Sequence, residues 1–266
     1  MTATVRTTPN PSAQVGWPRR TLSVLCLGLP ALAVLAFGGQ LLILGWLDSR
    51  PDGTFHVHDL AWGSAEGILL FVALVAASWN PRRLPAALQQ ALVVVGALLL
   101  TMVLTMAPDP ITVVLGALVV AGALLSPGRS LLLSRSAAVN WPLVGLTMVA
   151  AVALLPYAVS AAAAQRQGGS PHAELAGYTG AAVWALALLG TVGVAALQTR
   201  GWQLPALSAA AAAAVMGVAA LLWPVIPSSL GRPGGLLAIV WAGAVVAVVI
   251  RSRARSAKGV GRPAPD

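Results

Sequence analysis

Charged side chains are scarce in this chain of 266 residues, where they make up 9% of the sequence against roughly 25% in an ordinary soluble domain. Hydrophobic residues reach 58%. A chain with so few charges and so much apolar surface is not a soluble globular domain. The composition instead indicates a protein whose natural partner is the lipid bilayer.

Cysteine and lysine are almost absent. Cys26 is the only cysteine, so the chain cannot form an internal disulfide or a thiolate metal site. Lys258, the only lysine, lies in the C-terminal tail, which excludes a retinal Schiff base of the usual kind. The sequence also lacks a Walker A loop, a GxSxG elbow and an HExxH motif. These absences leave no established catalytic motif.

Long apolar runs fill most of the chain. There are eight, of about 16 to 26 residues, close to the ~20 residues that cross a bilayer as a helix. The predicted helices cover 21–46, 59–79, 85–107, 111–126, 138–163, 174–197, 205–223 and 235–250. We therefore predict an all-α polytopic membrane protein, with eight transmembrane helices in one membrane domain over 21–250.

The distribution of Lys and Arg predicts the orientation. Residues 1–20 are predicted to be a flexible tail and 251–266 a basic tail. With both termini cytoplasmic, thirteen basic residues lie inside and only Arg50, Arg166 and Arg232 outside. We therefore expect a multi-pass protein of the cell membrane. Although the net charge is +9, the basic residues lie at helix ends and in the tails, so we expect no nucleic-acid partner.

Two pairs of similar tripeptides suggest a duplication. They are Asp59-Leu60-Ala61 with Glu174-Leu175-Ala176, and Leu84-Pro85-Ala86 with Leu204-Pro205-Ala206. Four helices in each half predict two parallel repeats, 21–126 and 138–250, related by an axis along the membrane normal. The alternative is chance similarity in a chain rich in Ala and Leu.

Acidic residues and histidines concentrate on the predicted outer side, and Glu66 is the most distinctive of them. It follows Asp59 by seven residues, which places it on the same helix face and about 10 Å deeper, roughly a third of the way into the hydrocarbon. A carboxylate at that depth costs a few kcal/mol, so Glu66 is a candidate functional residue. The alternative is a protonated side chain that only joins helices. Gly63 and Gly67 form a GxxxG pattern that predicts close helix packing.

Two kinds of site follow from these residues. The first is a substrate or proton site at Glu66, with Asp59 and Glu174 at its entrance and Tyr178 as a nearby donor. The second is a divalent metal site. If His56 and His58 lie in extended backbone they point the same way, and His172 could complete the set of ligands. The alternative for the histidines is a solvated outer loop.

Three functions remain open at this point. The first is a small transporter or permease for a small solute or cation, with an outward-facing polar site. The second is a non-catalytic membrane subunit or scaffold that docks a protein partner. The third, and the least favoured, is a metal-dependent membrane enzyme that acts on a lipid-linked substrate. The sequence favours the transporter and does not identify its substrate.

Overall fold

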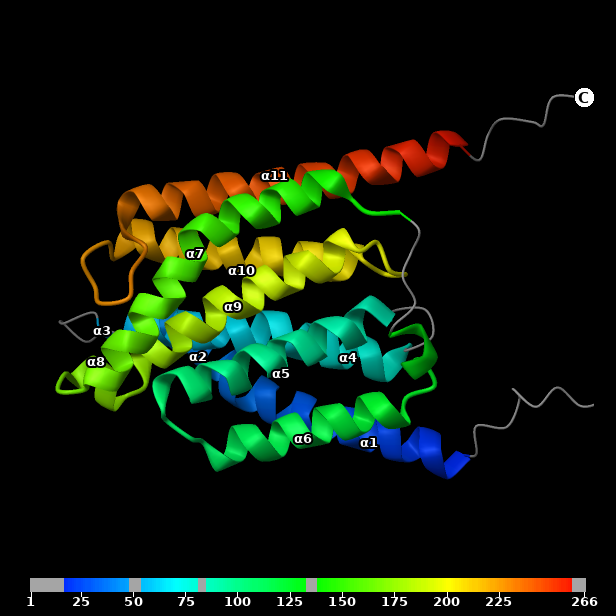
Figure 1. Cartoon of the computed structure of the whole chain (residues 1–266), viewed down its shortest axis with the longest axis horizontal. Coiled ribbons are helices and arrows are strands. Elements are labelled where there is room, and N and C mark those ends of the chain that lie inside the picture. Colours follow the sequence, from blue (N-terminus) through cyan, green and yellow to red (C-terminus); the bar gives the residue numbers. More distant parts are fainter. Residues whose placement is uncertain (1–16, 48–53, 81–84, 133–137, 260–266) are drawn as a thin grey trace, which may run out of the picture.

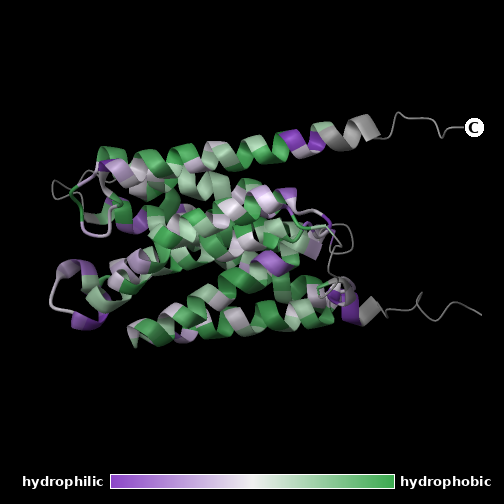
Figure 2. Cartoon of the chain, turned by 45° about the horizontal axis from the view of Figure 1, so that its top comes forward, coloured by the Kyte–Doolittle hydropathy of each residue, from purple (hydrophilic) through white to green (hydrophobic). Residues whose placement is uncertain are grey.

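The computed structural model describes residues 17–47, 54–80, 85–132 and 138–259, and this part of the chain consists of helices and contains no strand (Figure 1). The predicted all-α class is therefore confirmed. Apolar residues cover the helices along most of their length, and hydrophilic residues gather toward the two ends of the bundle (Figure 2). This pattern is typical of a protein that crosses a bilayer.

The helices alternate in direction between the two ends of the bundle. In the N-terminal half, the elements are α1 (Trp17–Val34), η2 (Leu35–Gly39), α2 (Gln40–Leu47), α3 (Thr54–Gly63), η3 (Ser64–Leu70), α4 (Phe71–Trp79), α5 (Pro85–Thr105), α6 (Pro110–Leu125) and the short η4 (Arg129–Leu131). In the C-terminal half they are α7 (Trp141–Gln167), α8 (Pro171–Glu174), α9 (Gly177–Ala196), α10 (Gln203–Leu222) and α11 (Gly231–Gly259). The η2 and η3 segments are π-helical and continue the helices on either side of them without a break.

Seven helices of the described chain are long and apolar enough to cross a membrane. The exception among the predicted spans is α6, an apolar helix of 16 residues. At 1.5 Å per residue it is about 24 Å long, shorter than a hydrocarbon core of about 30 Å. It lies against α1 and α5. The structure therefore supports a polytopic membrane protein and does not confirm the count of eight.

Helix α9 lies at the centre of the bundle, in contact with α3, α5, α7 and α10. In its most apolar stretch 83% of the residues are buried, compared with 22% in α7 and 28% in α11. The side chains that α7 and α11 leave exposed are large and apolar, including Val152 and Leu237. These peripheral helices therefore present lipid-compatible surfaces.

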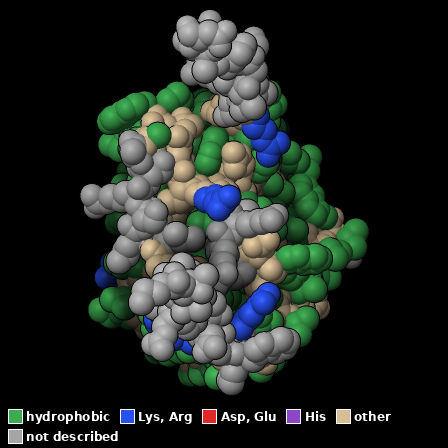
Figure 3. Space-filling view, turned by 90° about the vertical axis from the view of Figure 1, so that its right-hand side faces the viewer, with side chains coloured by type: hydrophobic (Ala, Val, Ile, Leu, Met, Phe, Trp, Pro, Cys, Tyr) green, Lys and Arg blue, Asp and Glu red, His purple; other side chains and the backbone are tan. Residues whose placement is uncertain are grey.

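Charge is segregated between the two ends of the bundle. The start of α1 and the end of α11 lie at the same end (Figure 1). That end also carries Arg19, Arg20, Arg129, Arg200, Arg251 and Arg253. Figure 3 views this end, and the coloured side chains visible there include Lys and Arg but no Asp, Glu or His. Among the described residues, the opposite end carries the basic side chains of Arg166 and Arg232 only. Arg50 and the residues before Trp17 lie outside the described residues.

The predicted duplication is not confirmed. Pro85 and Pro205 both fall in the first turn of a helix, as the repeat requires. The other pair is not equivalent, because Asp59-Leu60-Ala61 lies inside α3 whereas Glu174-Leu175-Ala176 lies where the chain breaks between α8 and α9. The predicted continuous helix over 174–197 is wrong for the same reason. Ala176 adopts a left-handed backbone with φ of 58° and ends the first segment.

Candidate functional site

The two π-helical segments pack against each other at Glu66. A Cβ atom added to Gly38 of η2 would lie 2.6 Å from the Glu66 Cβ and 2.8 Å from the Gly67 backbone nitrogen. A Cβ on Gly63 would lie 2.5 Å from the Leu42 backbone nitrogen. Only glycine permits backbones to approach this closely. The close approach expected at Gly63 and Gly67 is therefore present, and it fixes the position of the Glu66 backbone.

Glu66 lies midway along its membrane span. The span runs from Phe55 to Trp79, so Glu66 is 11 residues from one end and 13 from the other. Eleven residues correspond to about 16 Å along the helix. The helix begins at Thr54 rather than at the predicted residue 59, and the depth of Glu66 in a bilayer remains a prediction.

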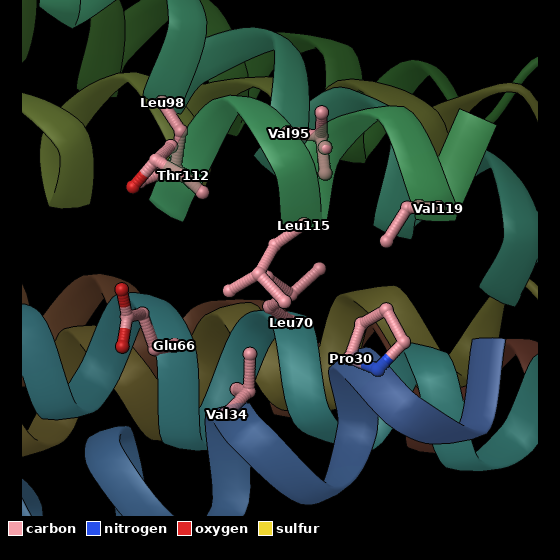
Figure 4. A pocket seen from close by; sticks show the side chains of 10 residues that line it. Pro30, Val34, Glu66, Leu70, Val95, Leu98, Thr112, Leu115 and Val119 are labelled. Carbon is pink, nitrogen blue, oxygen red and sulfur yellow. The ribbon is translucent and has the colours of Figure 1, made fainter. Parts of the chain in front are cut away.

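The Glu66 side chain borders a small cavity between η3 and helices α1, α5 and α6. The cavity is lined by Pro30, Val34, Glu66, Leu70, Val95, Leu98, Thr112, Leu115, Gly116 and Val119. Its volume of about 20 Å³ is enough for one water molecule and too small for an organic solute. In Figure 4 the Glu66 carboxyl group and the Thr112 hydroxyl lie toward the same end of the cavity, and Pro30 and Val119 toward the other. The cavity therefore has one polar end and one apolar end.

The Glu66 carboxyl group has no hydrogen bond or ion pair to any described residue. An ionised carboxylate midway through a bilayer is unfavourable by about 3 kcal/mol on insertion scales. Without a cationic partner, that charge must be balanced by a proton or by another bound cation. The position is therefore chemically suited to take up and release a cation.

Asp109 lies at the start of α6, near the polar end of this cavity. As the N-cap of α6 it accepts hydrogen bonds from the backbone nitrogens of Ile111 and Thr112, each at 3.1 Å. The Thr112 hydroxyl also donates to Asp109 Oδ2 at 2.6 Å. These bonds, the hydroxyl first, lower the pKa of Asp109 below its ordinary value. The charge of Asp109 also acts on Glu66.

His58 and Asp59 form a second polar group, which attaches α3 to the second half of the chain. His58 Nδ1 bonds to Asp59 Oδ1 at 2.7 Å, and its Nε2 donates to the Leu175 carbonyl at 2.9 Å. The two ring nitrogens of His58 thus each face an oxygen atom, one from Asp59 and one from the backbone of Leu175. Trp62, one turn further along, donates to the Ala176 carbonyl at 3.3 Å. The break between α8 and α9 supplies both of these carbonyls.

His172 lies beside this group in a buried position, with 2% of its surface exposed. Its Nε2 shares a hydrogen bond with the Ser228 hydroxyl at 2.9 Å, and its ring contacts Tyr178 edge-on at 4.5 Å between centroids. The His58 ring is 6.1 Å away. Burial, and then the charge of His58, lower the pKa of His172 from 6.5 to about 4. His172 is therefore neutral at physiological pH.

His56 faces a different direction from His58. Its Nδ1 donates to the Gly45 carbonyl at 2.7 Å, and its ring stacks on Trp223 at 4.0 Å. The premise of extended backbone is wrong, because both histidines lie in α3, where residues two apart point about 200° from each other. Within the described part of the chain no three His, Cys, Asp or Glu side chains form a group that could hold a metal ion. The metal site predicted from His56, His58 and His172 remains a prediction that the geometry does not support.

The structure therefore does not bring the predicted site residues together into one site. Glu66 borders the cavity with α1, α5 and α6, whereas Asp59 bonds to His58 beside α9. Tyr178 packs on His172, and Glu174 is exposed at the end of α8. Sequence reasoning missed Thr112 and did not assign Asp109 to the Glu66 site. An Asp-Pro-x-Thr sequence is the ordinary signature of a capped helix start, and it carries no other signal.

Gln90 is a further buried polar group that sequence reasoning did not assign to the site. Its Nε2 donates to the Leu69 carbonyl of η3 at 2.7 Å and to the Ser208 hydroxyl at 2.9 Å. A π-helical turn disturbs the regular hydrogen-bonding pattern, so an external donor stabilises it. Gln90, on α5, thus joins η3 to α10. Its contact with η3 is at Leu69, which lies within one turn of Glu66.

No protein-family model, curated protein or solved structure matches this chain.

Proposed function

We propose that this chain is a multi-pass protein of the cell membrane that crosses the bilayer eight times, with both termini in the cytoplasm. The alternation of the helices between the two ends of the bundle supports eight crossings. The short α6 can cross where the bilayer thins slightly to match it. The concentration of arginine at the end that carries both termini supports the orientation.

We further propose that the protein is a small transporter whose transported ion is a proton bound at Glu66. The observation that carries this proposal is the Glu66 carboxyl group, which lies midway along its span, beside a water-sized cavity and without a bonded partner among the described residues. The strain of a π-helical turn at this residue is consistent with a functional position.

The lining of the cavity favours a proton over a metal ion. Ca²⁺ takes six to eight oxygen ligands and Mg²⁺ takes six, and both usually require carboxylates. The cavity offers the Glu66 carboxyl group, the Thr112 hydroxyl and otherwise apolar side chains. A proton needs a single carboxylate oxygen and a water molecule to deliver it. The chemistry therefore fits proton uptake at Glu66.

Proton flux into proteoliposomes tests the proposal. Purified protein is reconstituted with a pH-sensitive dye inside the vesicles, and flux is driven by an imposed membrane potential. We expect Glu66→Gln, which keeps the size of the side chain, to reduce the rate to that of protein-free vesicles. Glu174→Gln removes an exposed carboxylate at the same end of the bundle and serves as the matched control. A Glu66→Gln protein with the wild-type rate of proton flux would contradict the proposal. If the flux depends on the Na⁺ gradient rather than on the H⁺ gradient, the transported ion is Na⁺ and not a proton.

A non-catalytic membrane subunit is the second candidate, and the His58 group favours it. His58, Asp59 and His172 are held by hydrogen bonds to each other or to neighbouring segments and do not line the Glu66 cavity. Such closed bonding is typical of a structural joint. If the wild-type protein produces no proton flux above protein-free vesicles, this second candidate is favoured over the transporter.

A further inference from the structure

The carboxylate whose charge acts on Glu66 belongs to Asp109, at the start of α6. The sequence instead predicts Asp59 and Glu174 at the entrance of the Glu66 site. Between Asp109 and Glu66 lies Thr112, which lines the Glu66 cavity and donates its hydroxyl hydrogen to Asp109 Oδ2 at 2.6 Å. Asp109 itself is exposed at the end of the bundle opposite the two termini. These three residues connect the exposed start of α6 to the cavity beside Glu66.

We propose that Asp109 and Thr112 form the outer entrance through which a proton reaches Glu66. This inference rests on the proposed function and adds the route and the side of entry. In this arrangement Asp109 collects the proton from solvent, the Thr112 hydroxyl relays it, and Glu66 receives it. The cavity beside Glu66 has room for the one water molecule that completes the relay.

The transfer balances as a relay in which the Thr112 hydroxyl first turns. When Asp109 is ionised, this hydroxyl donates to Asp109 Oδ2. When Asp109 is protonated, the hydroxyl rotates so that its oxygen accepts from Asp109 and its hydrogen faces the cavity. The O–H bond of protonated Asp109 then breaks as its proton binds the Thr112 hydroxyl oxygen. Thr112 releases its own hydrogen to the water, and the water releases one to a carboxylate oxygen of Glu66. Asp109 ends as a carboxylate and Glu66 as a carboxylic acid, while Thr112 and the water are unchanged.

The chemistry of the surrounding helices makes this route specific. The described residues of α5 and α6 contain no titratable side chain, and those of α1 are Arg19, Arg20 and Cys26. Cys26 lies near Gly122, toward the inner end of α6. Asp109 is therefore the carboxylate placed to deliver protons to the polar end of the cavity.

The other end of the cavity is lined by apolar groups. Pro30, Val95 and Val119 lie on the side away from Glu66 and Thr112 (Figure 4). These side chains cannot relay a proton, because each relay step needs a donor and an acceptor. The polar groups that could carry a proton to Glu66 therefore lie on the Asp109 side of the cavity.

Two conservative variants test the entrance in the proteoliposome assay. Asp109→Asn removes the collecting carboxylate but keeps a good N-cap, so α6 retains its start. Thr112→Val removes the relaying hydroxyl at nearly constant volume, and Thr112→Ser keeps it. We expect Asp109→Asn and Thr112→Val to slow proton flux about tenfold or more, since a positioned proton donor commonly contributes at least that much. Thr112→Ser should retain most of the wild-type rate.

Chemical rescue separates a proton-collecting role from a structural one. A small weak acid such as azide, added on the side that carries Asp109, should restore flux in Asp109→Asn. The same acid should not increase proton flux in Glu66→Gln. The flux in Glu66→Gln with acid also measures how much acid crosses the lipid without the protein.

Two results would overturn the inference. If Asp109→Asn and Thr112→Val match the wild type while Glu66→Gln abolishes flux, the entrance is wrong and the proposed function stands. If Glu66→Gln also retains wild-type flux, the proposed function fails as well.

Discussion

Protonation of His172 should destabilise the protein in acid. Its pKa is about 4 in the folded protein and 6.5 in the absence of burial. Between these values the unfolded state binds a proton that the folded state does not, so stability is present above pH 6.5 and is lost as the pH falls toward 4. From pH 7 to pH 4.5 this linkage amounts to at most about 2.5 kcal/mol.

His172→Phe isolates this contribution. Phenylalanine keeps a planar ring against Tyr178 and does not titrate, but it loses the hydrogen bond to Ser228, worth about 1 kcal/mol. We therefore expect the wild type to be more stable near pH 7 and the variant to be more stable near pH 4.5. Thermal unfolding midpoints in detergent at the two pH values measure both differences. Parallel pH dependences in the two proteins would refute the reasoning, because other carboxylates titrate equally in both.

Three further substitutions, with Gly96→Ala as a control, test the packing and the buried polar groups by the same unfolding measurement. Gly38→Val forces a side chain into η3 and should destabilise by about 1–3 kcal/mol, whereas Gly96→Ala, which has open space around it, should change stability by less than about 0.5 kcal/mol. Gln90→Leu leaves the Leu69 carbonyl without its donor and should destabilise by about 1–3 kcal/mol. His58→Phe should have an effect of similar size, since it removes two hydrogen bonds and leaves a buried carboxylate unpaired. Unchanged midpoints in Gly38→Val, Gln90→Leu and His58→Phe would mean that these contacts contribute little to stability.

Much of the architecture could be predicted because it follows from hydropathy and charge. The seven spans lie close to the predicted ranges, and the arginines of the described chain gather at the expected end. The predicted start of the third helix at residue 85 is also correct. These signals are local, so a single sequence contains them.

The details of the site depended on contacts that a single sequence does not contain. The π-helical turn at Glu66 exists because η2 and η3 approach through Gly38, far away in the sequence. The break at Ala176 depends on a left-handed residue that is not glycine, which sequence patterns rarely reveal. Asp109 could not be assigned to Glu66, because α6 had to be placed against α1 and α5 first.

The central claim is that Glu66 binds and releases a proton midway through the membrane span, and infrared spectroscopy tests it most directly. A protonated carboxyl group in an apolar site gives a carbonyl stretching band that disappears when the group ionises. We predict a pH-dependent band of this kind in the reconstituted wild type, absent from Glu66→Gln and retained in Glu174→Gln. A spectrum without such a band, or one in which the band persists in Glu66→Gln, would contradict the account.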